Sequence, residues 1–449
     1  MEFEALFIDP QNFPADWRVT RFPDLVFFQE GPGIRNWQFV ERDGVRFVNI
    51  RCLEDGRLVT SKMSQISWEE AYGKYSHFLL NANDFVVSSS GTLGRVATVQ
   101  EVDLPCCLNT SVIRMRPANE RLNRGYLKYF LLSDYYKNQI LAFANGSAQL
   151  NYGPTHLKQM EIVAPPIAEQ RAIAHILGTL DDKIELNRKT NETLEAMAKA
   201  LFKSWFVDFD PVRAKAEGRP TGLPAEISDL FPDSFEDSEL GVIPSGWEPR
   251  TIREWGRTEC GKAPSTHNQA FYGDDYMFVT IPDLHNGLHV ISSGKRLSKL
   301  GADSQSKKLL PPGSVMISCI ATPGLVGVAR KGCFTNQQIN SIIPNSKEAS
   351  WFLALAKIEN RDLLLSLGGG GSVFFNLSKG RFDEIEMLAP SEDLIGAYDE
   401  VVSALMDRYF ATKQEIIALT NVRDTLLPKL ISGEIRIPDA EQMLEEVGV

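Results

Sequence analysis

The chain has 449 residues, of which 43% are hydrophobic and 23% are charged, and its formal net charge is −11. The length corresponds to about three domains and the composition to a globular protein, which excludes a disordered or collagen-like chain. There is no run of about 18 apolar residues, so we expect no membrane span.

The negative charge is unevenly distributed. Residues 1–150 carry 16 Lys and Arg against 17 Asp and Glu, and residues 244–390 carry 16 against 13. The acidity lies in residues 208–247 and in the C-terminal tail, where a solvated surface is the ordinary explanation. Nucleic-acid binding through a local patch therefore stays open. Six cysteines without a CxxC pair, and a start without a basic and apolar leader, predict a cytoplasmic protein with reduced thiols.

Residues 1–158 are expected to form a first globular domain of mixed α/β type. Short runs of β-branched residues, separated by turn residues, are typical of strands, and a longer apolar pattern with helical spacing follows them. We predict strands within residues 45–50, 85–87, 95–99 and 111–115, and a helix over residues 124–140.

Residues 159–210 are predicted to contain a long spacer helix. It should start after Pro165-Pro166, because proline suits the first turn of a helix, and end at about Phe206, before Asp210-Pro211. A helix of about 40 residues is roughly 60 Å long. Residues 211–243 are acidic and rich in proline, which predicts a connector.

Residues 244–388 are expected to form a second, similar domain, followed by a second spacer helix within residues 389–436 and an acidic tail over residues 437–449. Pro428 should kink this second helix or end it early, because proline lacks the N–H of the helix ladder. Three segments echo strand segments of the first domain, namely Phe278–Ile281, Gly313–Ser318 and Asn336–Ile339.

The sequence also repeats internally. Residues 146–202 return at 371–427 with a constant offset of 225, which indicates two copies of a domain with its trailing helix. Both helices carry apolar residues at alternating spacings of three and four, which predicts that they pair as a coiled coil, with polar interruptions at Asn187 and Asn191. The alternative is that each helix packs only on its own domain, but a helix this long exceeds what one small domain can cover.

The sequence offers no convincing active site. The segment from Gly256 to Ala263 nearly matches a phosphate-binding loop, but Ala263 replaces the Ser or Thr that would hold Mg²⁺. His285 and His289 have helical metal-ligand spacing, yet Asn286-Gly287 is a turn signal between them. Neither a methyltransferase motif nor a nuclease-like carboxylate cluster is evident. We therefore expect a non-catalytic chain with no cofactor and no metal of its own.

Polar, glycine-flanked loops recur at similar places in the two copies. Small residues allow a close backbone approach to a ligand, and Asn, Gln and Arg offer the donors and acceptors that read base edges. Ordinary surface turns are the alternative explanation for each loop. The candidate DNA-binding residues are Ser90, Gly91, Thr92, Arg95, Gly146, Ser147, Gln149, Asn151, Thr322, Gln337, Gln338, Gly371, Ser372, Asn376 and Lys379.

Several segments of the spacer helices resemble the specificity subunit of type I restriction-modification enzymes. The similarity covers the whole chain and is most specific in the helices. The segments that carry it are Glu169–Ala174, Leu180–Ile184, Leu201–Phe206, Arg423–Ile435 and, at the entry to the second domain, Glu239–Trp247.

The resemblance implies two target-recognition domains separated by two long antiparallel coiled-coil helices, with a pseudo-two-fold repeat. Each domain would read one half of a bipartite, asymmetric site on double-stranded DNA. The helices would dock two methyltransferase subunits, which bind S-adenosylmethionine, and restriction subunits, which use ATP and Mg²⁺, would join them. Two other classes remain open, a coiled-coil scaffold that does not bind DNA and a self-contained enzyme.

Overall fold

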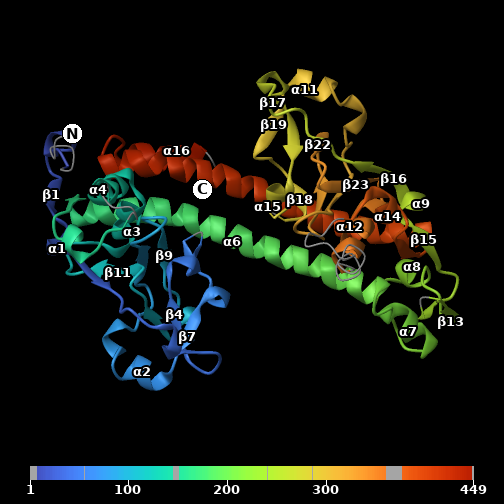
Figure 1. The fold of residues 1–449 in the computed structure, drawn as a ribbon, viewed down its shortest axis with the longest axis horizontal. Coiled ribbons are helices and arrows are strands. Elements are labelled where there is room, and N and C mark those ends of the chain that lie inside the picture. The colour runs from blue at the N-terminus through green and yellow to red at the C-terminus, as the bar shows by residue number, and fades with distance from the viewer. Residues whose placement is uncertain are drawn as a thin grey trace. The chain divides into compact units, whose positions relative to one another are not determined.

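The computed structural model describes residues 8–54, 56–144, 151–239, 241–285, 287–359 and 377–446. The chain forms two compact units (Figure 1). Unit 1 combines Met1–Leu186 with Glu415–Val449, and unit 2 consists of Asn187–Gln414. Each unit therefore contains one globular domain and one half of each spacer helix.

The helices of the described residues include two that are far longer than all the others. The α-helices are α1 Phe22–Leu25, α2 Trp68–Tyr72, α3 Arg124–Leu132, α4 Asp134–Ala144, α5 Pro154–Leu157, α6 Ile167–Phe206, α7 Asp210–Ala216, α8 Ala225–Ser228, α9 Ile252–Trp255, α10 Ile281–Leu284, α11 Lys299–Asp303, α12 Ala349–Glu359, α14 Lys379–Asp383, α15 Glu392–Ser432 and α16 Ile437–Glu446. Short 3₁₀ helices are η2 Pro10–Asn12, η3 Asn36–Gln38, η4 Ile50–Cys52, η5 Thr60–Lys62, η6 Ser76–Phe78, η7 Glu101–Asp103, η8 Gln269–Phe271 and η9 Ser306–Lys308.

The strands fall into two sets, one in each unit. Unit 1 has β1 Arg18–Arg21, β2 Val26–Glu30, β3 Phe39–Val40, β4 Val45–Val48, β5 Leu53–Glu54, β6 Arg57–Leu58, β7 Ser64–Ile66, β8 Phe85–Ser88, β9 Val96–Thr98, β10 Cys106–Leu108, β11 Val112–Pro117 and β12 Glu161–Ala164. Unit 2 has β13 Phe235–Ser238, β14 Gly241–Pro244, β15 Glu248–Thr251, β16 Gly256–Cys260, β17 Tyr272–Val279, β18 His289–Val290, β19 Lys295–Leu297, β20 Val315–Ser318, β21 Val326–Ala329, β22 Cys333–Thr335, β23 Ile339–Pro344 and β24 Glu386–Ala389.

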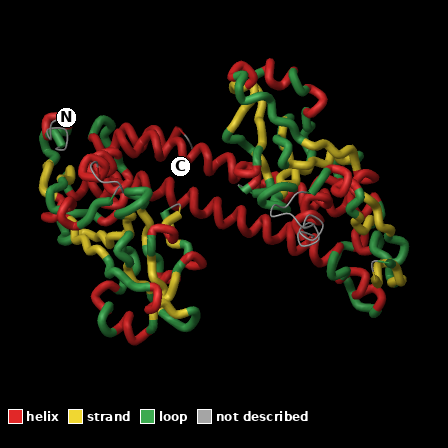
Figure 2. Tube along the Cα trace, viewed as in Figure 1, coloured by secondary structure: helices red, strands yellow, loops and turns green. Residues whose placement is uncertain are grey.

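The main sheets of the two units have corresponding strand orders, and Figure 2 shows in yellow the strands that form them. In unit 1 one sheet has the order β2-β11-β8-β9 and a second has β10-β4-β7-β3, with β4 parallel to β10. In unit 2 the counterparts are β16-β23-β20-β21-β18 and β19-β17-β22, with β17 parallel to β22. A short antiparallel pair leads into each long helix, β1 with β12 and β15 with β24. The predicted fold class of two similar mixed α/β domains is confirmed.

The spacer helices α6 and α15 pair antiparallel within each unit. In unit 2 the Tyr398 hydroxyl donates to the Ala198 carbonyl at 3.5 Å, and Thr412 donates to the side chain of Asn191. In unit 1 the apolar seam of α6, including Leu177 and Leu180, is buried in the same core as Leu426 of α15. Residue numbers rise along one helix while they fall along the other, as in the predicted coiled-coil pair. The bounds of α6 agree closely with those expected from the sequence, and α15 lies within the range expected for it, residues 389–436.

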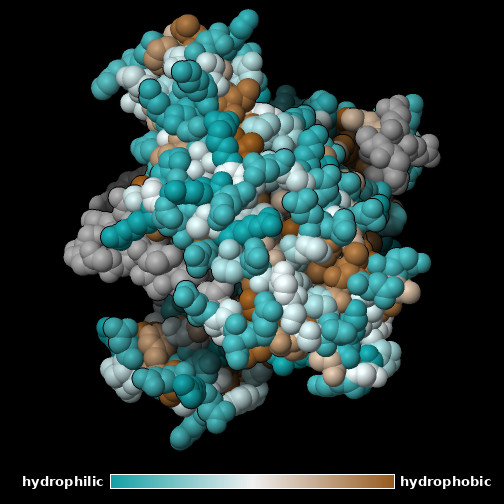
Figure 3. Space-filling view, turned by 90° about the vertical axis from the view of Figure 1, so that its right-hand side faces the viewer, coloured by the Kyte–Doolittle hydropathy of each residue, from teal (hydrophilic) through white to brown (hydrophobic). Residues whose placement is uncertain are grey.

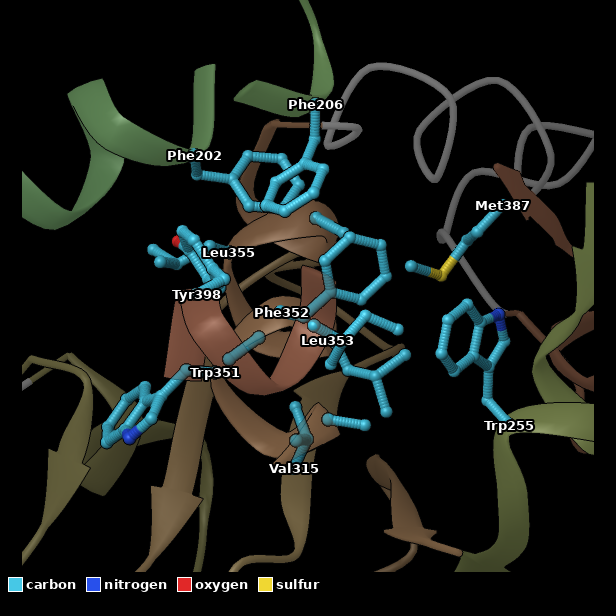
Figure 4. Close-up of a cluster of buried hydrophobic side chains, with 14 of the residues drawn as sticks. Phe202, Phe206, Trp255, Val315, Trp351, Phe352, Leu353, Leu355, Met387 and Tyr398 are labelled. Atoms are coloured by element: carbon cyan, nitrogen blue, oxygen red, sulfur yellow. The ribbon is translucent and has the colours of Figure 1, made fainter. Parts of the chain in front are cut away.

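The largest core of unit 2 is aromatic and joins the spacer helices to the domain. Figure 4 shows Phe202 and Phe206 from α6 beside Tyr398 from α15 and Phe352 from α12. The Phe206 ring lies 5.0 Å from that of Phe352 and 4.9 Å from that of Tyr398, both in edge-to-face geometry. Such pairs stabilise a core beyond the area that they bury. The domain and its halves of the two helices therefore share one hydrophobic core.

Three local expectations were wrong. The helix α15 does not end early at Pro428 but continues through it to Ser432, so only a kink at this proline stays a prediction. The single helix expected over residues 124–140 is two helices, α3 and α4. Ser133 separates them in an extended conformation, with its hydroxyl donating to the Phe130 carbonyl at 2.6 Å. The strand expected to reach Ile281 ends at Val279, and Ile281 begins α10.

The residues predicted as a connector are ordered where the structure describes them. They include α7, α8 and the hairpin of β13 with β14, and Val212 and Phe231 are buried in the core of unit 2. The apolar residues within this acidic segment explain the order, because each one buries surface against the aromatic cluster. The predicted domain boundaries follow the chain, whereas the compact units combine distant segments, so those boundaries stay a prediction.

A polar network holds α6 and α15 together in unit 1. Asp181 of α6 accepts hydrogen bonds from Arg423 of α15 at 2.9 Å and from the Tyr129 hydroxyl at 2.8 Å, and Lys128 pairs with the same carboxylate. Burial by itself would raise the pKa of Asp181. The charge and hydrogen bonds of Lys128, together with those of Arg423 and Tyr129, hold that pKa below its usual range instead.

We expect Asp181→Ala to lower the free energy of unfolding by about 2 kcal/mol, because Lys128, Tyr129 and Arg423 would lose their common partner. The adjacent, exposed Asp182→Ala is the matched control and should change little. Since the folded-state pKa lies below the unfolded value of about 4, this contribution is present above that pH and is lost as pH falls through the folded value. Urea unfolding of both variants between pH 3 and pH 7 measures it, and equal losses would contradict the network's role.

Candidate functional site

In unit 1, polar loops gather at one end of the sheet formed by β2, β11 and β8. The strand β2 ends at Glu30 opposite Ile113, and β8 ends at Ser88 opposite Val112, so both strands stop where β11 begins. The loops that follow these strands therefore share one end of the sheet. We call this end edge 1; it comprises Glu30–Gly31, Ser88–Arg95, Asn109–Ser111 and Asn151–Gly153.

The loop Ser88–Arg95 is held by one buried hydroxyl. The Ser88 Oγ donates to the Thr92 carbonyl at 2.6 Å and accepts from the Arg95 amide at 2.9 Å. The Gly94 amide donates to the Ser88 carbonyl at 3.1 Å, and Gly94 has a φ of +73°, which favours glycine. The frame is rigid, and it leaves the side chains of Thr92 and Arg95 exposed.

Two further segments complete edge 1. The Tyr152 amide donates to the Ser89 carbonyl at 3.0 Å, and Ser90 forms a β-bridge with Asn151. Gly31 lies so close to Asn109 that a Cβ on it would be 2.5 Å from the Asn109 carbonyl oxygen. The structure thus brings Asn151 beside the loop that carries the candidates Ser90, Gly91, Thr92 and Arg95.

Unit 2 contains the same frame. The Ser318 Oγ donates to the Thr322 carbonyl and accepts from the Leu325 amide at 2.8 Å, and the Gly324 amide donates to the Ser318 carbonyl at 3.0 Å. Leu377 donates its amide to the Cys319 carbonyl at 3.0 Å, as Tyr152 does to Ser89. We call this sheet end edge 2; it comprises Cys260–Gly261, Ser318–Leu325, Asn336–Gln338 and Leu377–Lys379.

The candidate residues of edge 2 differ in how far their side chains are available to a ligand. Gln337 is exposed, whereas the Gln338 side chain accepts from the Asn336 amide group at 2.9 Å and its carbonyl accepts from the Cys319 amide. Lys379 is exposed at the start of α14 and pairs with Asp383 at 2.8 Å. Thr322 contributes its carbonyl to the loop frame, so only its side chain is available to a ligand.

The two edges carry different charges on similar frames. Glu30 in edge 1 corresponds in position to Cys260 in edge 2, because β2 and β16 end at the same register beside Gly31 and Gly261. Burial raises the pKa of both side chains, and Lys308 and Lys379 oppose that effect at Cys260. Arg95 likewise corresponds to Leu325. The backbone frames match, whereas the side chains presented to a ligand do not.

Comparison with known proteins identifies the family. The family model described as the type I restriction modification DNA specificity domain matches residues 14–196 and 244–421, once for each copy of the repeat. The chain belongs to this family. It is 38% identical over 320 residues to the type I restriction enzyme HindI specificity subunit of Haemophilus influenzae, a match that covers 62% of this chain and 70% of that protein.

Other specificity subunits are more distant but match the chain over almost its full length. The MjaIX specificity subunit of Methanocaldococcus jannaschii is 24% identical over 441 residues, which cover 96% of both chains. The crystal structure of the S subunit of a type I restriction-modification system from M. genitalium shares the fold, with a TM-score of 0.57, 16% identity and coverage of 95% and 98%. The resemblance drawn from the spacer-helix segments is therefore confirmed.

Six of the sequence candidates of this specificity subunit lie outside the described residues, so nothing is said of their placement. They are Gly146, Ser147, Gln149, Gly371, Ser372 and Asn376. The structure also adds residues that were not among the candidates, namely Glu30, Asn109, Cys260 and Asn336. Their sequence signal was the recurrence of a strand followed by glycine at Gly31 and Gly261, which identified neither the strand's last residue nor its neighbours in space.

The motifs considered for catalysis have structural roles. The segment that nearly matches a phosphate-binding loop contains β16, an extended strand rather than a loop. His289 lies in β18 with its Nε2 at 2.9 Å from the Met406 carbonyl, and burial lowers its pKa to about 4. Among the described residues no three His, Cys, Asp or Glu side chains are grouped as a metal site. No described helix is both long and apolar enough to cross a membrane.

Hydrophilic side chains cover most of the face in Figure 3, and its hydrophobic residues form separate small patches. Isolated apolar residues on a surface are normal, whereas larger patches mark interaction sites. The described residues nevertheless include several exposed apolar side chains on the spacer helices, among them Leu186 and Met197 of α6 and Ile417 of α15.

The buried hydroxyl of Ser88 should fix the conformation of its loop. We expect Ser88→Ala to cost about 1–2 kcal/mol of stability, because the Arg95 amide would lose its acceptor. Hydrogen exchange at the Arg95 amide should accelerate in Ser88→Ala. Ser90→Ala, two residues further along the loop, is the control and should leave this exchange unchanged. Ser318→Ala with the Leu325 amide is the same test in unit 2. Unaltered exchange at both amides would contradict a structural role for these hydroxyls.

Proposed function

We propose that this specificity subunit reads a bipartite, asymmetric site on double-stranded DNA, with edge 1 contacting one half-site and edge 2 the other. The observation that carries the proposal is the pair of matching loop frames with different exposed side chains. Because the two loop frames match, each frame would present its side chains to its own half-site in the same way. Side chains of different chemistry recognise different bases. The half-sites are therefore expected to differ in sequence.

The groups at both edges suit base recognition. Arginine and glutamine form paired hydrogen bonds with guanine and adenine in the major groove, and small loop residues let the backbone approach the DNA. Arg95 in edge 1 and Gln337 in edge 2 are exposed on their frames. Lys379 suits phosphate contact, which positions a protein without specifying sequence. A local surface of this kind is compatible with a chain whose net charge is −11.

The spacer helices are proposed to dock two methyltransferase subunits. Within unit 1, Leu186 is 64% exposed and Ile417 is 42% exposed, and within unit 2 Met197 of α6 is 50% exposed. Single exposed apolar residues are ordinary on a surface, so this part of the proposal is supported by the family of the chain, and these side chains are the ones that a partner helix would cover. The partners would bring S-adenosylmethionine, and restriction subunits would bring ATP and Mg²⁺. In the cytoplasmic complex this chain would act as the non-catalytic subunit.

The alternative is a coiled-coil scaffold that does not bind DNA. It would use the same exposed apolar residues of the spacer helices but would not need two matching polar edges. A gel-shift experiment with fragmented genomic DNA, using the chain together with its methyltransferase partner, discriminates between the two functions. Sequence-selective binding that weakens with salt supports the DNA reader, because phosphate contacts release counterions.

Substitutions at the two edges should separate the two half-sites. We expect Arg95→Ala to relax the first half-site and leave the second intact, and Gln337→Ala to do the reverse, with about 1–3 kcal/mol of discrimination lost for each good contact. Methylation-site profiling of each complex measures the preferences, and melting temperatures check folding. Equal loss at both half-sites, or lower stability with unchanged preference, would contradict the assignment.

The spacer should determine the gap between the half-sites. Four residues inserted after Asn191, with four more after its partner Thr412, would lengthen both helices by about 6 Å, close to two base pairs of B-DNA. We expect the recognised gap to grow while both half-site sequences stay the same. The matched control inserts four residues into the connector after Arg219. An active complex with the original gap would argue against the spacer's role.

A further inference from the structure

Glu30 places a carboxylate in edge 1 that has no hydrogen-bond or ion-pair partner among the described residues. Glu30 is the last residue of β2. Its Oε2 lies 3.8 Å from the position that a Cβ on Gly153 would occupy. The carboxylate therefore adjoins the segment Asn151–Gly153, in which Asn151 forms a β-bridge with Ser90. Glu30 is half-buried. Among the described residues, none donates a hydrogen bond to this side chain or forms an ion pair with it. Within the described part of edge 1, the Glu30 carboxylate therefore accepts no hydrogen bond beside Gly153.

This placement is costly for a structural residue. A partly buried carboxylate without a partner loses hydration, and burial accordingly raises the pKa of Glu30. A negative charge at a DNA-facing edge also repels phosphates. Both costs are offset if the carboxylate meets a hydrogen-bond donor on the DNA. In the major groove, the donors are the exocyclic amino groups of cytosine and adenine.

We propose that Glu30 is a specificity-determining residue that accepts a hydrogen bond from the N4 amino group of a cytosine in the first half-site. The inference rests on the proposed function of edge 1. Cytosine is favoured because its major-groove edge offers a donor without an acceptor, whereas adenine places the N7 acceptor beside its amino group. Guanine and thymine present only acceptors there, and a carboxylate would be repelled by them.

Edge 2 has no carboxylate at the position that corresponds to Glu30. Cys260 occupies the corresponding strand end, and its thiol contacts the Gln337 carbonyl at 3.8 Å. A thiol is a weak donor and acceptor, so it cannot replace a carboxylate as the partner of an amino group. The two half-sites should therefore differ at the base pair that faces this position. Glu30 provides one physical reason for the asymmetry of the site.

The test uses the full chain with its methyltransferase partner. Glu30→Gln keeps the shape of the side chain but adds an amide donor, which matches the paired acceptor and donor of adenine. At one position of one half-site we expect the preference to move from C·G to A·T, with cytosine disfavoured by about tenfold. Glu120→Gln is the matched control, because Glu120 is exposed beyond the opposite end of β11.

Methylation-site profiling and competition binding with four oligonucleotides, one for each base pair at that position, provide the readouts. Glu30→Ala should lose discrimination without gaining adenine, and melting temperatures show that the variants fold. An unchanged preference in the folded Glu30→Gln complex, or a lowered melting temperature with the original preference, would overturn the role of Glu30 while the proposed function stands. A wild-type complex without bipartite preference would instead refute the proposed function and this inference with it.

Discussion

The antiparallel pairing of α6 and α15 is the constraint on which the rest of the structure depends. A helix of this length exposes an apolar seam that one small domain cannot cover, so each seam must be buried by the other helix and by a domain. Each compact unit consequently takes its core from segments at distant places in the chain, such as Phe206, Phe352 and Tyr398 in unit 2. The largest core of each unit contains residues of the domain and of its halves of both helices.

Polar groups within the helix pair give it a specific register. Apolar seams can slide by a heptad at little cost, whereas a buried polar side chain stabilises only the register in which it finds a partner. Asn191 meets Thr412 in unit 2, and Asp181 meets Arg423 in unit 1. At the positions that correspond to Asp181 and Arg423, unit 2 has the apolar residues Met406 and Ala198. The repeat thus preserves helix geometry while it uses different chemistry in its two halves.

In each edge, the residues that maintain the loop frame differ from the residues that we propose recognise DNA. Ser88 and Ser318 are buried and satisfy the same backbone groups, so they maintain the loop frame in both units. The side chains of Glu30 and Cys260, or of Arg95 and Leu325, occupy equivalent places and take no part in the hydrogen bonds of Ser88 and Ser318, which bind the backbone amides of Arg95 and Leu325. Such positions can change without loss of stability, because a substitution there removes no buried hydrogen bond. Under the proposed function, this separation lets one fold present a different recognition surface at each edge.

Much of the architecture was determined by the sequence itself. The seam of three-four spacing and the flanking prolines predicted α6, and the constant offset of 225 predicted the duplicated fold. Local rules were insufficient at Ser133, which caps the end of α3, and at Pro428, through which α15 continues. Only the tertiary structure placed Glu30 beside Gly153 and Ser90 beside Asn151. These neighbours depend on pairing between strands far apart in the chain, which no local sequence pattern encodes.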